Sequence, residues 1–118
     1  MWKGLELKRE FIYTKKFDKG WEKQSLTDED LRQLELYLIE NSGTGDIMQG
    51  TGGLRKIRWS LAGRGKSGGI RVLYIDLTDR QLICMIDLFP KDEKENLSKA
   101  ERNAIKQIVK IIAEELRK

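Results

Sequence analysis

The chain has 118 residues, of which 39% are hydrophobic and 36% charged, and its formal net charge is +4. This length supports one domain, 1–118, with a single modest core, and the composition excludes a disordered chain. No apolar run approaches the roughly 18 residues that a membrane span requires, and the start MWKGLELKRE lacks the features of a signal peptide. We therefore expect a cytoplasmic protein in which the one cysteine, Cys84, is a buried thiol.

The first third of the chain predicts a short strand and a helix. Lys8 to Thr14, KREFIYT, has the aromatic and β-branched content of a strand. Leu26 to Ser42 is predicted to be a helix, with Thr27 as its N-cap, acids in its first turn and Gly43 at a left-handed end. A short helical turn around Lys16 to Gln24 precedes it. The apolar stripe of the helix consists of Leu31, Leu34 and Leu38.

Three strands are predicted in the middle of the chain, at Ile47 to Leu61, Ile70 to Leu77 and Gln81 to Phe89. The last two form a hairpin around the turn Thr78-Asp79-Arg80. Both are nearly continuous apolar runs, so we expect them to lie centrally in the sheet, under a helix. Pro90 ends the third strand.

A second long helix is predicted from Asn96 to Arg117. Ser98 and Glu101 fit a capping box at its start. Apolar residues recur at helical spacing through Ile105, Ile108, Val109, Ile111, Ile112 and Leu116. The order strand, helix, three strands, helix predicts a small α+β sandwich of sheet and helices.

Basic charge is concentrated in one part of the chain. Between Ile47 and Ile75 there are six basic residues and no acidic one, whereas the remainder carries 17 basic and 19 acidic residues. A local field of this sign attracts a polyanion and releases its counterions, as at a nucleic-acid site. An exposed hairpin with cations for solubility explains the charge equally well. The six residues are Arg55, Lys56, Arg58, Arg64, Lys66 and Arg71.

The many glycines do not form a nucleotide-binding loop. Gly65-Lys66-Ser67 matches the end of GxxxxGK[ST], but Ser60 stands where the leading glycine belongs, and a strand follows instead of a helix. Gly50-x-Gly52 would need a further glycine where Arg55 stands. We expect the glycines at bends and bulges of strand ends.

The chain has no histidine, which excludes a Ser-His-Asp triad, a histidine-based ribonuclease and His-ligated metal sites. We expect no metal and no cofactor. Alternation along the strand places Lys56 and Arg58 on one face of the sheet, and Ile57 and Trp59 on the other. Without histidine, any enzyme chemistry must use arginine and lysine, and an aromatic residue can contribute to it.

The run GDIMQGTGGLRKIRWSLAGRGKSGGIRVLYID, followed by KDEKENLSKAE, resembles the RelE-like toxins of type II toxin–antitoxin pairs, in particular the phage-related HigB branch. GTGGLRK-x-R and GG-x-RV carry most of this resemblance. It implies a RelE-like fold, with a curved, mainly antiparallel four-stranded sheet packed with N-terminal helices and a long C-terminal helix. It also implies an endoribonuclease that cuts mRNA on the ribosome and is neutralised by an antitoxin, commonly a small helix-turn-helix protein.

The resemblance implies a reaction in which the 2′-hydroxyl of one nucleotide attacks the adjacent phosphate and leaves a 2′,3′-cyclic phosphate. Arginine grips phosphate oxygens without losing its proton, whereas a lysine ringed by cations has its charged form disfavoured. Lys56 is therefore the candidate proton acceptor. The implied catalytic residues are Lys56, Arg58, Arg71 and Lys94, and the implied RNA-binding residues are Arg55, Arg64, Lys66, Phe89 and Lys91.

Two positions depart from the family pattern. Related sequences often carry a tyrosine at Phe89 and a small residue at Pro90; Phe89 can stack on a base but offers no hydroxyl. Two other functions therefore stay open. A non-catalytic RNA- or ribosome-binding module, such as a decayed toxin, would bind RNA in a salt-sensitive way without cutting it. A protein-interaction domain would use the basic face for an acidic partner and have no affinity for RNA.

Overall fold

The structure is a computed structural model that describes residues 10–60, 69–77, 81–90 and 97–116. One sheet has the strand order β1-β5-β4-β3-β2. The only parallel pair is β1 with β5, and the other described neighbours are antiparallel. The predicted α+β fold is confirmed, with five strands in the sheet rather than four. These are β1 (Glu10–Tyr13), β2 (Asp46–Ile47), β3 (Leu54–Trp59), β4 (Ile70–Leu77) and β5 (Leu82–Pro90).

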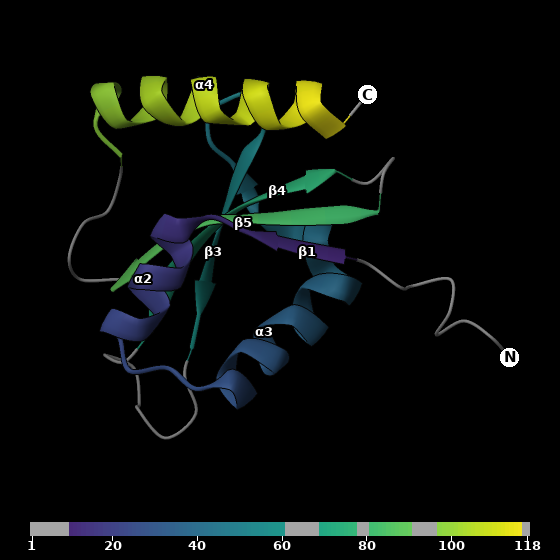
Figure 1. Ribbon diagram of the computed structural model, residues 1–118, viewed down its shortest axis with the longest axis vertical. Coiled ribbons are helices and arrows are strands. Elements are labelled where there is room, and N and C mark those ends of the chain that lie inside the picture. The colour runs from purple at the N-terminus through teal and green to yellow at the C-terminus, as the bar shows by residue number, and fades with distance from the viewer. Residues whose placement is uncertain (1–9, 61–68, 78–80, 91–96, 117–118) are drawn as a thin grey trace, which may run out of the picture.

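Helices cover both faces of the sheet (Figure 1). The helices α2 (Lys15–Lys23) and α3 (Asp28–Asn41) lie on one face, and α4 (Lys99–Leu116) crosses the other. The hairpin strands β4 and β5 lie inside the sheet, as predicted, and β5 ends at Pro90. The turn predicted at 78–80 lies outside the described residues.

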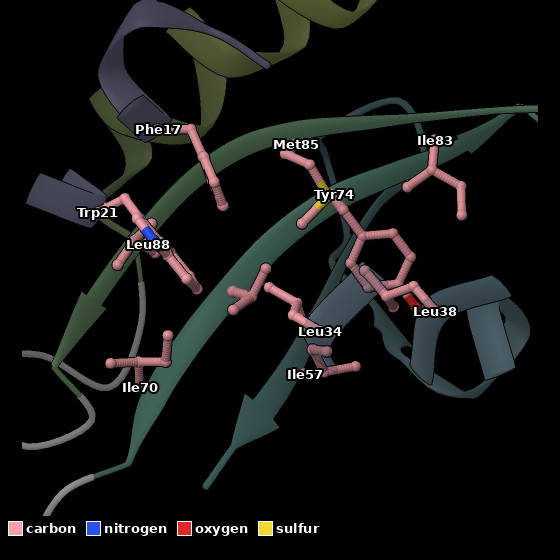
Figure 2. Packing of buried hydrophobic residues seen from close by; sticks show 11 residues of the cluster. Phe17, Trp21, Leu34, Leu38, Ile57, Ile70, Tyr74, Ile83, Met85 and Leu88 are labelled. Atoms are coloured by element: carbon pink, nitrogen blue, oxygen red, sulfur yellow. The ribbon is translucent and has the colours of Figure 1, made fainter. Parts of the chain in front are cut away.

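The first core lies between the sheet and the helices α2 and α3 (Figure 2). Phe17 and Trp21 stack with their ring centroids 5.6 Å apart. Tyr74 of β4 is fully buried in this layer, and its hydroxyl donates a hydrogen bond of 2.5 Å to the Ser42 carbonyl. Burial raises the pKa of Tyr74, so this hydroxyl keeps its proton and ties the end of α3 to the sheet.

The start of α3 agrees with its prediction, but its end does not. Thr27 and Asp30 form a capping box, with each side chain accepting a hydrogen bond from the other's backbone N–H. The left-handed end predicted at Gly43 is wrong, because the chain continues into the 3-10 helix η1 (Ser42–Thr44). Tertiary donors, among them the Tyr74 hydroxyl, satisfy the carbonyls at this end, so no left-handed residue is required.

The single strand predicted at Ile47 to Leu61 is wrong, since a tight turn at residues 48–53 separates β2 from β3. Gly50, Gly52 and Gly53 have φ of 75°, 79° and 115°, a left-handed backbone that ends an extended strand. The buried Thr51 hydroxyl donates to the Met48 carbonyl at 2.6 Å and accepts from the Leu54 N–H at 3.1 Å. This turn makes β2 and β3 an antiparallel pair. Leu61 itself lies outside the described residues.

The second core lies between the sheet and α4. Ile105 and Val109 of α4 are each 6% exposed. The predicted apolar stripe is too wide, because Ile108 and Ile111 turn away from the sheet and are 42% and 59% exposed. The thiol of Cys84 is fully buried in this core, as expected, and burial raises its pKa to about 11.

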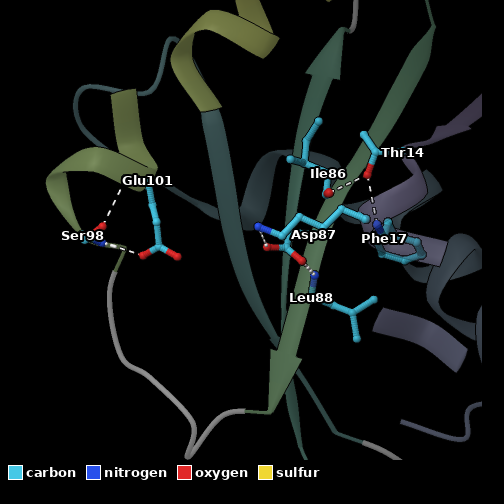
Figure 3. A network of polar contacts seen from close by, with 8 residues as sticks. Thr14, Phe17, Ile86, Asp87, Leu88, Ser98 and Glu101 are labelled. Atoms are coloured by element: carbon cyan, nitrogen blue, oxygen red, sulfur yellow. Dashed lines mark hydrogen bonds and ion pairs between the residues drawn. The ribbon is translucent and has the colours of Figure 1, made fainter. Parts of the chain in front are cut away.

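The start of α4 is fixed by its cap and by one arginine. The Ser98 hydroxyl accepts a hydrogen bond from the Glu101 N–H at 3.1 Å, and the Glu101 carboxylate accepts one from the Ser98 N–H at 2.9 Å (Figure 3). This is the predicted capping box. Arg102 then donates to the Gln49 carbonyl at 2.8 Å, which ties α4 to the turn between β2 and β3.

No helix within the described parts of the chain is long and apolar enough to span a membrane.

Candidate nucleic-acid interface

Sheet register brings three of the predicted cations to one face. Along β3, Ile57 packs in the core beneath α2 and α3, while Leu54 packs in the core beneath α4. Because side chains alternate along a strand, Lys56 and Arg58 project on the α4 side, as the sequence predicts. Arg58 lies directly opposite Arg71 of β4, which projects on the same side. Lys56, Arg58 and Arg71 form what we call the cationic face.

The two arginines of the cationic face differ in exposure. Arg58 is exposed, whereas Arg71 is only 6% exposed. Like charges directly opposite each other on neighbouring strands are destabilising, unless a group of opposite charge lies between them. Two guanidinium groups can grip the oxygens of one phosphate through several charge-assisted hydrogen bonds. The pair is therefore suited to a phosphate group.

Lys56 lies in mixed rather than purely cationic surroundings. Its direct partner across the β2–β3 pair is Asp46, so both side chains project on the same face. Asp46 and Arg102 line the same pocket as Lys56. The sequence segment around Lys56 contains no acid, but the pairing of β2 with β3 brings one beside it. The surroundings of Lys56 therefore differ from the all-cationic ones that the sequence suggests.

Arg55 is not part of the cationic face. Its neighbour in the sheet is Tyr74, which lies in the core on the side of α2 and α3. The Arg55 guanidinium donates to the Gly45 carbonyl at 2.6 Å and to the Gly43 carbonyl at 3.3 Å. These bonds attach η1 to the sheet and give Arg55 a structural role, while its predicted role in RNA binding stays a prediction.

Arg55→Gln is expected to lower the free energy of unfolding by about 1–3 kcal/mol, because two backbone carbonyls lose a charged donor. Urea denaturation followed by circular dichroism measures this change. Weaker RNA binding at unchanged stability would contradict the structural role of Arg55.

Phe89 is placed beside the cationic face but inside the core. It lies directly opposite Arg71 on the neighbouring strand and is 6% exposed, packed among the residues beneath α4. In this position its ring packs in the core and supports the strand that carries Arg71, and its predicted role in RNA binding stays a prediction. Four other predicted site residues lie outside the described ranges: Arg64, Lys66, Lys91 and Lys94.

Leu73, the neighbour of Lys56 in the sheet, pairs on its other side with a buried acid. This acid already has structural partners (Figure 3). Asp87 of β5 is 6% exposed. Its carboxylate forms an ion pair of 3.2 Å with Lys16 of α2 and accepts a hydrogen bond of 2.8 Å from the Leu88 N–H. Nearby, the Thr14 hydroxyl donates to the Ile86 carbonyl at 2.6 Å and caps α2. These contacts fix the start of α2 on β5 where the strand departs from regular register.

Sequence reasoning missed Asp46 and Arg102. Asp46 directly precedes the acid-free segment, and only the pairing of a two-residue strand shows that it faces Lys56. Arg102 is on a polar side of a predicted helix, where no motif distinguishes it from other surface cations. Its contact with Gln49 joins residues far apart in the chain, so the sequence carries no local signal for it.

Fold and site together define a small α+β protein with a cationic sheet face beside its C-terminal helix. A variant of the E. coli toxin RelE with two arginines replaced by alanine, in the free state, has a similar fold. It is 17% identical, with a TM-score of 0.50 over 74% of this chain and 87% of that chain. The isolated E. coli RelE toxin is 18% identical, with a TM-score of 0.49 over 86% of this chain and 99% of that chain.

The family follows from the sequence itself. The model of the family described as the RelE toxin of the RelE/RelB toxin–antitoxin system matches residues 9–118. The chain therefore belongs to the RelE toxin family.

Proposed function

We propose that this protein is an mRNA endoribonuclease toxin of the HigB branch, which acts in the cytoplasm on translating ribosomes and is neutralised by a cognate antitoxin. The observation that carries the proposal is the direct pairing of Arg58 with Arg71, with Lys56 on the same face. Membership of a toxin–antitoxin family supports it, as does the motif GTGGLRK-x-R. A small helix-turn-helix protein encoded beside it is the expected antitoxin.

In the proposed reaction, the 2′-hydroxyl of one nucleotide attacks the adjacent phosphorus, and the bond to the 5′-oxygen of the next nucleotide breaks. Negative charge grows on the phosphate oxygens in the transition state. Arg58 and Arg71 stabilise this charge from adjacent strands. Because Arg71 is buried, its interaction with the phosphate is less weakened by water than that of an exposed cation.

Lys56 keeps the part predicted from the sequence, that of the proton acceptor. It lies on the same face as Arg58 and Arg71, and it takes the proton of the attacking 2′-hydroxyl. The same proton then passes to the leaving 5′-oxygen. Lys94 remains a proposed catalytic residue, outside the described part of the chain.

The alternative is an RNA- or ribosome-binding module that does not cut. The position of Phe89 favours it, because this residue is buried and has no hydroxyl to offer to the reaction. Both functions use the cationic face, so RNA binding alone does not separate them. The formation of new RNA ends does.

A translating extract tests the proposal with two reporter messages, one of which carries an early stop codon. Mapping 5′ ends after addition of the protein is expected to show new ends throughout the translated frame of the first message. In the second message they should be confined to the region before the stop codon. Salt-sensitive RNA binding without new ends would support the binding module instead, and equal cutting on both sides of the stop codon would contradict the ribosome requirement.

A further inference from the structure

A pocket of about 250 Å³ lies beside the cationic face, and it is lined by Asp46, Ile47, Met48, Gln49, Lys56 and Arg102. Clefts that hold drug-sized ligands measure about 300–1,000 Å³, so this pocket suits a single ring system. Met48 belongs to the apolar core beneath α4 and is 6% exposed. Its thioether gives the pocket a soft apolar surface of the kind that contacts aromatic rings.

The acid in this pocket is unexpected on a surface that binds phosphate. Asp46 is exposed and projects on the same face as Lys56 and the two arginines. A carboxylate there repels the phosphates of RNA, but it accepts hydrogen bonds from the N–H groups of a base. Asp87, by contrast, is buried and bonded to Lys16 and to the Leu88 N–H. Asp46 is therefore the acid of the two that is positioned to meet a ligand.

The pocket also has a cation whose position is fixed by backbone contacts. Arg102 reaches from α4 and donates to the Leu97 carbonyl at 3.3 Å and to the Gln49 carbonyl at 2.8 Å. A guanidinium has five N–H donors, so donors remain for a ligand after these two bonds. The turn that supplies Gln49 is itself held by the Thr51 hydroxyl. The pocket thus combines the carboxylate of Asp46 from β2 with a guanidinium that backbone carbonyls hold in place from α4.

We propose that this pocket binds the base of a nucleotide next to the scissile phosphate, and that it prefers guanine. This inference rests on the proposed function. Guanine has the donors N1–H and N2–H, which match the Asp46 carboxylate. It also has the acceptors O6 and N7, which match a guanidinium such as that of Arg102. Lys56 lines the pocket and lies on the cationic face, so the base and the bound phosphate belong to neighbouring positions of one strand.

Mapping of cleavage sites tests the proposal, using a reporter mRNA with randomised codons in a translating extract. The wild-type protein is expected to show guanine enriched at one fixed position next to the cut. Asp46→Asn should reduce this enrichment by about tenfold and shift it toward adenine, because an amide pairs with adenine instead. Asp18→Asn is the matched control, since Asp18 is an exposed acid on α2, outside the pocket. It should leave the wild-type preference unchanged.

Three results would overturn the proposal. One is an identical base profile in the wild-type protein and Asp46→Asn, with cleavage retained. Another is an Asp46→Asn variant that cuts less at every site in equal proportion, which would assign Asp46 to the reaction instead. If the wild-type protein makes no cuts at all, the proposed function fails first and the base preference falls with it.

Discussion

Arg58→Gln is expected to lower mRNA cleavage in a translating extract by about 10²–10³-fold, the loss typical when one donor to a developing oxyanion is removed. Arg58 is exposed, so the substitution leaves the core intact. The free energy of unfolding should change by less than about 0.5 kcal/mol, as for most substitutions of exposed residues. Primer extension measures the cleavage, and urea denaturation measures the stability.

Arg55→Gln is the matched control for Arg58→Gln. It makes the same substitution three residues earlier on β3, where the side chain bonds the Gly43 and Gly45 carbonyls. It should lose stability and keep its cleavage activity, the reverse of the pattern for Arg58→Gln. Undiminished cleavage by Arg58→Gln would contradict the role of the cationic face. Arg71→Ala is a less clean test, because Arg71 is buried and its loss also alters packing.

Thr51→Val is expected to lower the free energy of unfolding by about 2–4 kcal/mol, although the side chains have nearly the same shape. The Thr51 hydroxyl is fully buried and bonds both the Met48 carbonyl and the Leu54 N–H. The methyl group that valine has in place of the hydroxyl cannot form hydrogen bonds, so the buried Met48 carbonyl and Leu54 N–H both lose this partner. Because the turn positions β3 and Gln49, cleavage should fall as well.

Thr51→Ser is the control, since it keeps the hydroxyl and removes only a methyl group. The free energy of unfolding of Thr51→Ser should be closer to the wild-type value than the free energy of unfolding of Thr51→Val is. Thermal and urea unfolding measure both. If Thr51→Val and the wild-type protein have the same midpoint of urea unfolding, the hydroxyl does not hold the turn.

The elements that could be predicted from sequence are those with strong local signals. The strand predicted at Ile70 to Leu77 has the same bounds in the structure, because an apolar run between glycines and a turn allows few other readings. The capping boxes at Thr27 and Ser98 are equally local, since their partners lie three residues away. Alternation along β3 also assigned Lys56 and Arg58 to the same face.

The features that could not be predicted depend on partners distant in the chain. The turn at residues 48–53 is short enough to be hidden inside an apparent strand, and the pairing of Asp46 with Lys56 follows only from it. Arg55 has the same charge as its neighbours, but its guanidinium bonds the carbonyls of Gly43 in η1 and of Gly45, which no local pattern indicates. Phe89 is aromatic at a position suited to stacking, yet the approach of α4 buries it.

The central claim, that the cationic face supports cleavage by a 2′-hydroxyl, is tested most directly by one chemical substitution in the RNA. A reporter mRNA carries a single 2′-deoxynucleotide at a mapped cleavage site, and 5′ ends are quantified after addition of the wild-type protein to a translating extract. We expect cleavage to disappear at that site and to persist at neighbouring sites. Undiminished cleavage at the deoxy position would contradict the account.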